Sequence, residues 1–166
     1  LYYEVNRDLA IETAKKSIED GVKQFVFLSS MSVYGLNEGV ITKDTTPYPK
    51  NNYGKSKLQA EELLKELTKN KIRLVILRPP MVYGENCRGN YQALRKIALK
   101  FPFFPKVKNM RSMIYIENLC EFVRILIKNE EIGTFFPQNK EYCNTSEIVK
   151  TISETHGKKI KLVSCA

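Results

Sequence analysis

The chain has 166 residues, of which 43% are hydrophobic and 27% are charged, and its formal net charge is +9. This length suits a domain with a sizeable core, and no stretch reaches the roughly 18 apolar residues that a membrane-spanning helix needs. The lysines are interspersed with glutamates rather than gathered with aromatic residues, so a small phosphate-bearing molecule is a better candidate partner than nucleic acid.

The thiols and the one imidazole of the chain do not indicate a metal site. The cysteines are Cys87, Cys120, Cys143 and Cys165, and the histidine is His156. No Cys-x-x-Cys pair occurs, and the spacing fits no zinc site. We therefore expect free thiols, no metal and a cytoplasmic location. No secretory signal opens the chain, which starts without methionine and which we interpret as a fragment.

Apolar residues in the first half of the chain follow the periods of alternating helices and strands. The pattern predicts a helix at 6–19, a strand at 24–30 and a long loop at 31–52. A helix at 53–70, which Asn51 or Asn52 can cap, and a second strand at 72–77 follow. Both strands are short, almost unbroken apolar runs, which is typical of a parallel sheet covered on both faces. A strand, a helix and a strand form a βαβ unit, so we predict an α/β fold with a doubly wound parallel sheet.

The pattern changes after Pro80, where loops become more frequent and apolar runs shorter. We predict a loop at 81–90, a helix at 90–101, a strand at 109–116 and a helix at 117–129. A short strand at 135–136, a helix at 145–156 that Thr145 or Ser146 can cap, and a last apolar segment at 160–163 follow. We therefore divide the chain into residues 1–80 and residues 81–166.

Tyr53 and Lys57 stand four residues apart at the start of the second predicted helix. This spacing places both side chains on one helix face, one turn apart. A positive charge beside a phenol favours the phenolate, so the pair can take a proton from a hydroxyl group while a hydride leaves for a nicotinamide. The alternative is an ordinary solvated helix face, because a lysine-rich chain with nine tyrosines can produce this spacing by chance.

Polar and proline residues follow both predicted strands. Ser29 and Ser30 end the first strand, and Pro79 and Pro80 follow the second. Ligands of parallel sheets bind beyond the carboxyl ends of the strands, so these residues lie at the expected ligand edge. Serines at a strand end also commonly serve as caps or turns, and that alternative stays open for Ser30.

Four motifs follow one another along the chain: SSMSVYG at 29–35, YGKSK at 53–57, LRPPMVYG at 77–84 and RSMIYIENL at 111–119. In this order and spacing they resemble the extended short-chain dehydrogenase/reductases, especially nucleotide-sugar epimerases of the UDP-galactose 4-epimerase type. The resemblance implies part of a Rossmann-like dinucleotide-binding domain in residues 1–80. It implies most of a smaller α/β domain for a nucleotide-sugar substrate in residues 81–166.

The resemblance also implies a catalytic role for three residues. Tyr53 is the expected base and acid, Lys57 the residue that binds the nicotinamide ribose and favours the phenolate, and Ser30 the residue that bonds the sugar hydroxyl. The implied reaction is an NAD-dependent epimerisation in which a hydride leaves the sugar and returns to its other face. NADP stays open as the cofactor, and a homodimer as the assembly.

The remaining implied contacts concern binding. By resemblance, Asn6, Ser29 and Pro80 lie near the cofactor, and Arg111 grips the substrate diphosphate. A guanidinium suits that task because it bonds phosphate oxygens in pairs.

The chain departs from the family pattern at several points. Met31 and Ser32 stand where sugar dehydratases carry an acidic pair, so we do not expect dehydration. Met81 stands where many epimerases place a substrate-binding asparagine, and the segment 137–140 replaces a glycine-containing turn. No Gly-x-x-Gly-x-x-Gly loop precedes a helix, so we expect the chain on its own to be inactive.

Two other functions stay open from the sequence. One is a reductase of a nucleotide-linked keto sugar that consumes NADPH and uses the same tyrosine and lysine. The other is a non-catalytic relative that senses nucleotides. Intact Ser30, Tyr53 and Lys57 argue against a sensor, because a sensor needs no residue for proton transfer.

Overall fold

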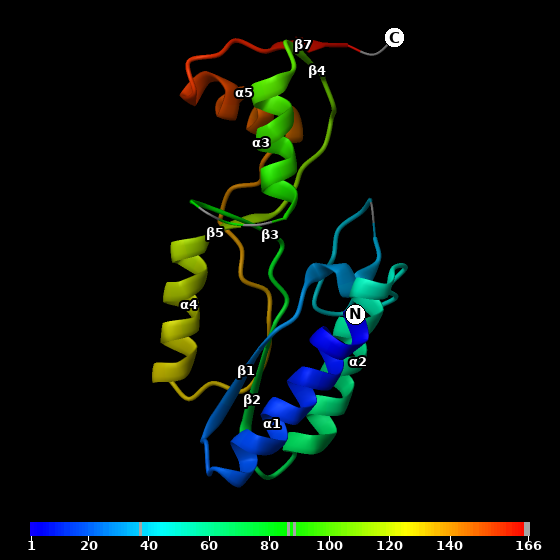
Figure 1. The fold of residues 1–166 in the computed structure, drawn as a ribbon, viewed down its shortest axis with the longest axis vertical. Helices are drawn as coiled ribbons and strands as arrows, with labels where there is room; N and C mark the ends of the chain where they lie inside the picture. Colours follow the sequence, from blue (N-terminus) through cyan, green and yellow to red (C-terminus); the bar gives the residue numbers. More distant parts are fainter. Residues whose placement is uncertain (37, 86, 88, 165–166) are drawn as a thin grey trace. The chain divides into compact units, whose positions relative to one another are not determined.

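The structure, a computed structural model, describes residues 1–36, 38–85, 87 and 89–164. It divides into two compact units (Figure 1). The first unit comprises residues 1–79 and 122–137, and the second comprises residues 80–121 and 138–166 within the described ranges. The chain leaves the first unit near the division expected at residue 80, but the sequence pattern gave no sign that 122–137 return to it.

A three-stranded parallel sheet forms the centre of the first unit. Its strands are β1 (Gln24–Leu28), β2 (Arg73–Leu77) and β6 (Gly133–Phe135), in the order β1-β2-β6. Gln24 is in register with Arg73, and Val75 with Gly133. The parallel sheet and the βαβ connection between β1 and β2 are thus as predicted, with β6 beginning two residues before the predicted phenylalanine pair.

Helices cover both faces of this sheet. A π-helix, η1 (Glu4–Asp8), continues into α1 (Leu9–Glu19), which packs beside α2 (Asn52–Thr68) on one side of β1 and β2. Figure 1 shows α4 (Ile116–Lys128) on the other side of these strands. Alternate residues of a strand point to opposite faces, and β2 follows this rule. Leu74 and Ile76 join the core under α1 and α2, whereas Val75 and Leu77 pack with Leu126 and its neighbours in the part of α4 that belongs to this unit.

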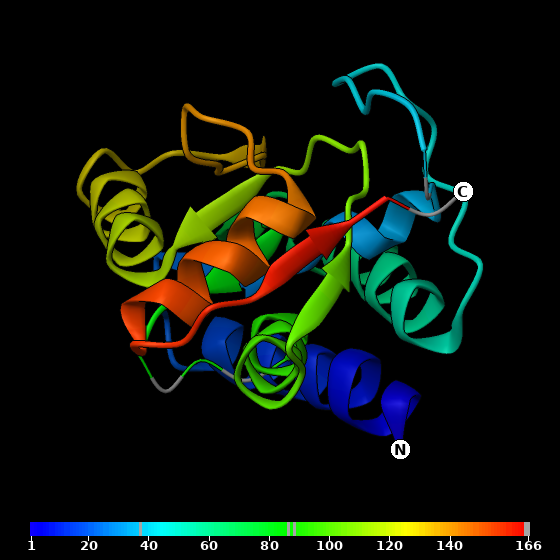
Figure 2. The ribbon, with the colours of Figure 1, turned by 90° about the horizontal axis from the view of Figure 1, so that it is seen from above.

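Two short pairs of parallel strands form the framework of the second unit. Strand β3 (Met81–Tyr83) pairs with β5 (Met113–Tyr115), and β4 (Phe103–Pro105) pairs with β7 (Lys161–Val163). Figure 2 shows β4 and β7 side by side next to α5 (Thr145–Thr155). Helix α3 (Asn90–Lys100) packs on α5 around a core of Ala98, Val149, Ile152 and Ile160. The sequence pattern missed β3, which lies in a predicted loop, and β4.

The cap of α2 was predicted correctly, and the cap of α5 was not. Asn51 caps α2, as expected, and its side chain accepts a hydrogen bond from the backbone N–H of Gly54 at 2.8 Å. The prediction that Thr145 or Ser146 caps α5 is wrong, because Asn144 is the cap and accepts from the N–H of Ser146 at 2.8 Å. The Ser146 hydroxyl is buried and donates instead to the carbonyl of Pro105 at 3.0 Å.

Within the described residues, no helix combines the length and apolar character needed to cross a membrane. The same part of the chain contains no group of three or more His, Cys, Asp or Glu side chains that could hold a metal ion. Cys87, Cys120 and Cys143 are free thiols, and Cys165 lies outside the described residues.

Candidate active site

The amino end of α2 places the predicted tyrosine and lysine. The helix begins at Asn52, one residue before the predicted start, so Tyr53 lies in its first turn and Lys57 in the next. Both side chains are half-buried. The Tyr53 ring packs edge-on against the ring of Tyr2, with the ring centroids 6.1 Å apart. The helix therefore presents the pair from a fixed and partly enclosed turn rather than from a fully solvated face.

Lys57 is anchored at the carboxyl end of β1. Its Nζ donates a hydrogen bond to the backbone carbonyl of Leu28 at 2.8 Å and stands 4.9 Å from the centre of the Phe27 ring. Burial lowers the pKa of Lys57, and the carboxylate of Glu61, one helical turn away, acts in the opposite direction. The structure thus holds a positive charge at the strand end, with a carboxylate that helps to maintain it.

Asn6 connects the first helix to the turn that carries Tyr53. Its Nδ2 donates to the Ser56 hydroxyl at 3.2 Å, and that hydroxyl donates to the backbone carbonyl of Tyr53 at 2.9 Å. Ser56 is fully buried and Asn6 is half-buried, so this chain of hydrogen bonds is partly shielded from solvent. Asn6 therefore lies beneath the Tyr53 turn, and its predicted contact with a cofactor stays a prediction.

Ser30 forms a turn that packs against the same end of α2. It caps the 3₁₀ helix η2 (Met31–Tyr34): its Oγ accepts from the N–H of Ser32 at 3.1 Å and donates to the Ser32 Oγ at 3.1 Å. Gly54 in α2 lies so close to the Ser32 carbonyl that any side chain at this position would collide with it. Ser30 therefore does act as a cap, which was the alternative open from the sequence. The turn that it caps packs against the first turn of α2, and Ser30 is half-buried there.

Ser29, Pro80 and Arg111 have different surroundings. The Ser29 hydroxyl is buried and donates to the carboxylate of Glu61, so it is engaged inside the first unit. Pro80 and Arg111 belong to the second unit. Arg111 forms an isolated antiparallel bridge with Cys143 through backbone hydrogen bonds of 2.8 and 2.9 Å, and its residue surface is exposed. The bridge fixes its backbone and leaves the guanidinium available, while all three binding roles stay predictions.

Comparison with known proteins identifies the family. Residues 2–136 match the NAD dependent epimerase/dehydratase family. The chain belongs to this family. The match covers the helix of Tyr53 and Lys57, the Ser30 turn and Arg111, and it confirms the resemblance on which the predicted roles were based.

Two curated members of the epimerase/dehydratase family illustrate the similarity. N-acetyl-alpha-D-glucosaminyl-diphospho-ditrans,octacis-undecaprenol 4-epimerase of Escherichia coli O157:H7 is 36% identical over 167 residues, which cover 96% of this chain and 50% of that protein. UDP-glucose 4-epimerase of Vibrio cholerae is 33% identical over 165 residues, which cover 92% of this chain and 49% of that protein. The chain therefore spans about half the length of the curated relatives that it matches.

A solved structure of the epimerase/dehydratase family confirms the α/β fold. UDP-glucuronic acid 4-epimerase from Bacillus cereus, in complex with NAD, superimposes with a TM-score of 0.81 at 25% identity. The match covers 95% of this chain and 54% of that chain. Rossmann-like parallel sheets with covering helices are thus shared between the two proteins.

A buried polar cluster behind the Tyr53 helix was not predicted as a functional feature, although its members lie in or beside the family motifs. Arg78 Nε donates to the Glu61 carboxylate at 3.0 Å and Nη2 at 2.5 Å, while Nη1 donates to the Tyr34 hydroxyl at 2.6 Å. Glu61 is 0% exposed and Arg78 is 7% exposed. The one available sequence signal was the position of Glu61, which follows Lys57 by four residues.

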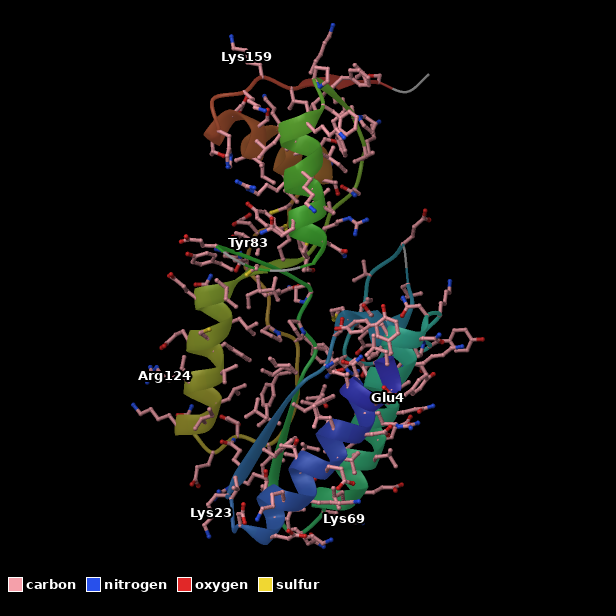
Figure 3. The ribbon with its side chains drawn as sticks, viewed as in Figure 1. Glu4, Lys23, Lys69, Tyr83, Arg124 and Lys159 are labelled. Atoms are coloured by element: carbon pink, nitrogen blue, oxygen red, sulfur yellow. The ribbon has the colours of Figure 1, made fainter. Side chains whose placement is uncertain are left out.

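The first unit also has a basic cavity of about 580 Å³ at the amino ends of its strands. Figure 3 shows Lys23 and Lys69 at this end of the unit. None of the predicted site residues lines the cavity, whose cationic lining consists of Lys23, Lys65, Lys69, Lys71 and Arg73. These lysines are exposed, so the cavity is a solvated basic surface and the candidate site is the opposite edge of the sheet.

Proposed function

We propose that this chain carries the proton-transfer residues of an NAD-dependent epimerase that acts at C4 of a nucleotide-linked hexose, as UDP-hexose 4-epimerases do. The observation that carries the proposal is the start of α2. Tyr53 and Lys57 lie there on successive turns, the Lys57 ammonium is fixed at the carboxyl end of β1, and the Ser30 turn packs on the same end of the helix. The two 4-epimerases that match nearly the whole chain favour this reaction over reduction.

Each of the three residues has a distinct task. Tyr53, as phenolate, takes the proton of the sugar C4 hydroxyl and later returns it. Lys57 stabilises the negative charge of the phenolate through its own positive charge. Ser30 bonds the same sugar oxygen and orients it toward Tyr53. NAD, when bound, supplies the acceptor and donor of the C4 hydride.

The polar groups of the first unit fit the nicotinamide end of NAD rather than its pyrophosphate. The Lys57 ammonium has three N–H donors, and the Leu28 carbonyl takes one, so further donors can bond the ribose hydroxyls. The sequence has no glycine-rich loop before a helix, the usual site of a pyrophosphate. The roles of Asn6, Ser29 and Pro80 toward the cofactor rest on the family resemblance.

The substrate class follows from what the two curated relatives share. One acts on a sugar linked through a diphosphate to undecaprenol, and the other on UDP-glucose. Both substrates are hexoses esterified to a diphosphate, and the exposed Arg111 guanidinium suits that group. We take the UDP-hexose as the first candidate, and the higher identity to the Escherichia coli enzyme makes the lipid-linked sugar the second.

The test uses the full-length protein that carries this chain, with catalytic amounts of NAD. UDP-glucose, UDP-N-acetylglucosamine and undecaprenyl-diphosphate-N-acetylglucosamine are each incubated with it, and products are followed by NMR. We expect one of them to convert to its C4 epimer without net consumption of cofactor. Stoichiometric oxidation of NADPH on a keto sugar would replace the epimerase proposal with the reductase.

A further inference from the structure

Packing alone does not explain the buried cluster of Ser29, Tyr34, Glu61 and Arg78. Removing a carboxylate and a guanidinium from water is costly, and apolar side chains of similar volume often stabilise a core as well or better. Here the ion pair is almost wholly enclosed, and the Arg78 guanidinium lies 5.1 Å from the centre of the Tyr34 ring and 5.9 Å from that of Phe136. A cluster of this kind is expected where geometry or charge must be fixed.

One side of the cluster holds the turn of Ser30. Tyr34 is the last residue of η2, the 3₁₀ helix that Ser30 caps, and it is 1% exposed. Its hydroxyl accepts a hydrogen bond from Arg78, whose backbone N–H is in turn fixed to the Phe135 carbonyl at 3.0 Å. The turn is therefore tied at its far end to the sheet through the Arg78 side chain.

The other side of the cluster faces Lys57. Glu61 follows Lys57 by one turn on α2 and is the carboxylate whose charge favours the protonated lysine against the effect of burial. Tyr53 is the other titratable neighbour on the helix, and Arg78 stands behind Glu61 from the end of β2. The β1 residues against the ammonium, Phe27 and Leu28, are uncharged. Glu61 is thus the group best placed to control the charge of Lys57.

We propose that Glu61, Arg78 and Tyr34 are positioning residues that keep Lys57 positively charged and hold the Ser30 turn against the helix of Tyr53. Arg78 orients the Glu61 carboxylate through two hydrogen bonds and the turn through a third. Ser29 adds a further bond to the carboxylate from the end of β1. Glu61, Arg78 and Tyr34 are all buried, so they act through Lys57 and Ser30. This inference rests on the proposed function, which gives those two residues their tasks.

The first experiment measures the titration of Lys57 in the full-length protein by NMR of labelled lysine side chains, with Lys57→Arg used to assign its resonance. In Glu61→Gln the midpoint of the Lys57 titration moves to lower pH, because the favourable charge is removed. Glu62→Gln is the matched control: it makes the same chemical change at the next residue of α2, on the exposed face. An unchanged midpoint in Glu61→Gln, or an equal fall in both variants, overturns the proposal.

A second variant covers the case in which Glu61→Gln does not fold because Arg78 is left as an unpaired buried charge. The double change Glu61→Gln with Arg78→Met removes both charges and keeps similar volumes. It loses the same carboxylate but also the Arg78 charge, which acts on Lys57 in the opposite direction from behind Glu61, so the Lys57 midpoint falls less than in Glu61→Gln. A midpoint equal to that of the unaltered protein in this folded variant also overturns the proposal.

The second experiment tests the Ser30 turn by amide hydrogen exchange. Tyr34→Phe removes only the hydroxyl that Arg78 holds, so the backbone N–H groups of Val33 and Gly35, which bond within the turn, exchange about threefold faster or more. Tyr142→Phe, at an exposed tyrosine of the second unit, leaves these rates unchanged. Equal rates in the two variants remove the turn-holding part of the proposal.

The outcomes separate this proposal from the function on which it rests. If the Lys57 midpoint does not change in Glu61→Gln while the unaltered protein epimerises its substrate, the positioning network is refuted and the enzyme assignment stays in place. Absence of any turnover in the unaltered protein refutes the function, whatever the titration shows.

Discussion

In the first unit an ion pair lies in the interior beside the candidate site, whereas in the second unit neutral side chains such as Asn144 and Ser146 fix the loop before α5. Glu61 and Arg78 are almost completely buried. Asn144, by contrast, caps α5 and donates to the carbonyls of Val107 and Asn109 at 2.8 and 3.1 Å. A neutral amide that bonds backbone groups fixes a loop at little electrostatic cost, while a buried ion pair is costly to desolvate and strict in geometry.

The same contrast holds for the candidate functional side chains. Lys57 is partly desolvated and held by a carbonyl, an aromatic ring and a nearby carboxylate. Arg111 has a fixed backbone but an exposed side chain. Proton transfer needs a group whose charge and position are fixed before the substrate binds, whereas a cation that binds the substrate needs a side chain that extends to it. This difference agrees with the proposal that the first unit carries proton transfer and the second unit binds the substrate.

The largest expected effect is that of Tyr53→Phe in the full-length protein. This change keeps the ring and its contact with Tyr2 but removes the proposed proton acceptor. General acid and base catalysis is typically worth about 10²–10⁴-fold, so the single-turnover reduction of bound NAD by substrate slows by that factor, while thermal unfolding is nearly unchanged. Tyr142→Phe in the second unit serves as control and leaves the rate unaltered. Wild-type rates in Tyr53→Phe would remove the enzyme assignment.

The second effect concerns stability and tests whether the first unit depends on its ion pair. Arg78→Met alone leaves the Glu61 carboxylate buried without its partner, and such a change costs about 3–5 kcal/mol of unfolding free energy. Combined with Glu61→Gln, the loss is much smaller, because no unpaired charge remains. Urea unfolding of both variants measures the difference. Equal losses in the single and double variants would show that packing, not charge, holds this part of the fold.

The third effect compares two asparagines that each cap a helix, one in each unit. Asn51 caps α2 and Asn144 caps α5, and replacing either by alanine is expected to cost about 1 kcal/mol of stability. Only Asn51→Ala is expected to lower turnover as well, because its helix carries Tyr53. Urea unfolding and steady-state rates for the two variants make the comparison. A similar loss of turnover in Asn144→Ala would contradict the division of tasks.

Sequence reasoning predicted most of the fold because the relevant signals are local. The apolar runs of β1 and β2, the polar cap at Asn51 and the spacing of Tyr53 and Lys57 each occupy a few neighbouring residues. Strands β3 and β4 were missed because each is a three-residue segment beside prolines, which disfavour strands: Pro79 and Pro80 precede β3, and β4 follows Pro102 and ends at Pro105. The wrong cap of α5 has a similar origin, since three successive residues, 144–146, all have side chains suited to capping.

The rest of the site depends on contacts that the linear sequence does not reveal. Glu61 is 17 residues from Arg78 and 32 from Ser29, and a glutamate on a helix is normally exposed. Asn139 is another case, in the segment that departs from the family pattern. Its side chain donates to the Tyr83 hydroxyl at 3.0 Å and accepts from the N–H of Tyr115 at 3.3 Å, so it joins β3 and β5 of the second unit. Such roles appear only once the fold has brought the partners together.

The smallest expected effect is the contribution of Lys57 to the pH dependence of stability. Burial lowers the pKa of Lys57 in the folded protein below its ordinary value of 10.5, so the unfolded chain binds this proton more tightly. Below the folded pKa the charged lysine therefore disfavours folding slightly, and this cost disappears as the pH rises from the folded pKa to above 10.5. Lys57→Met removes the charge and should be slightly more stable than the unaltered protein at neutral pH, with the advantage shrinking toward pH 10.5. Urea unfolding of both proteins across this range measures it, with exposed Lys55→Met as the control that shows no such trend. A Lys57→Met variant that is less stable at neutral pH would mean that the Leu28 carbonyl and the Glu61 carboxylate more than offset the burial of the ammonium, and that the charge in the first unit is held at no cost to the fold.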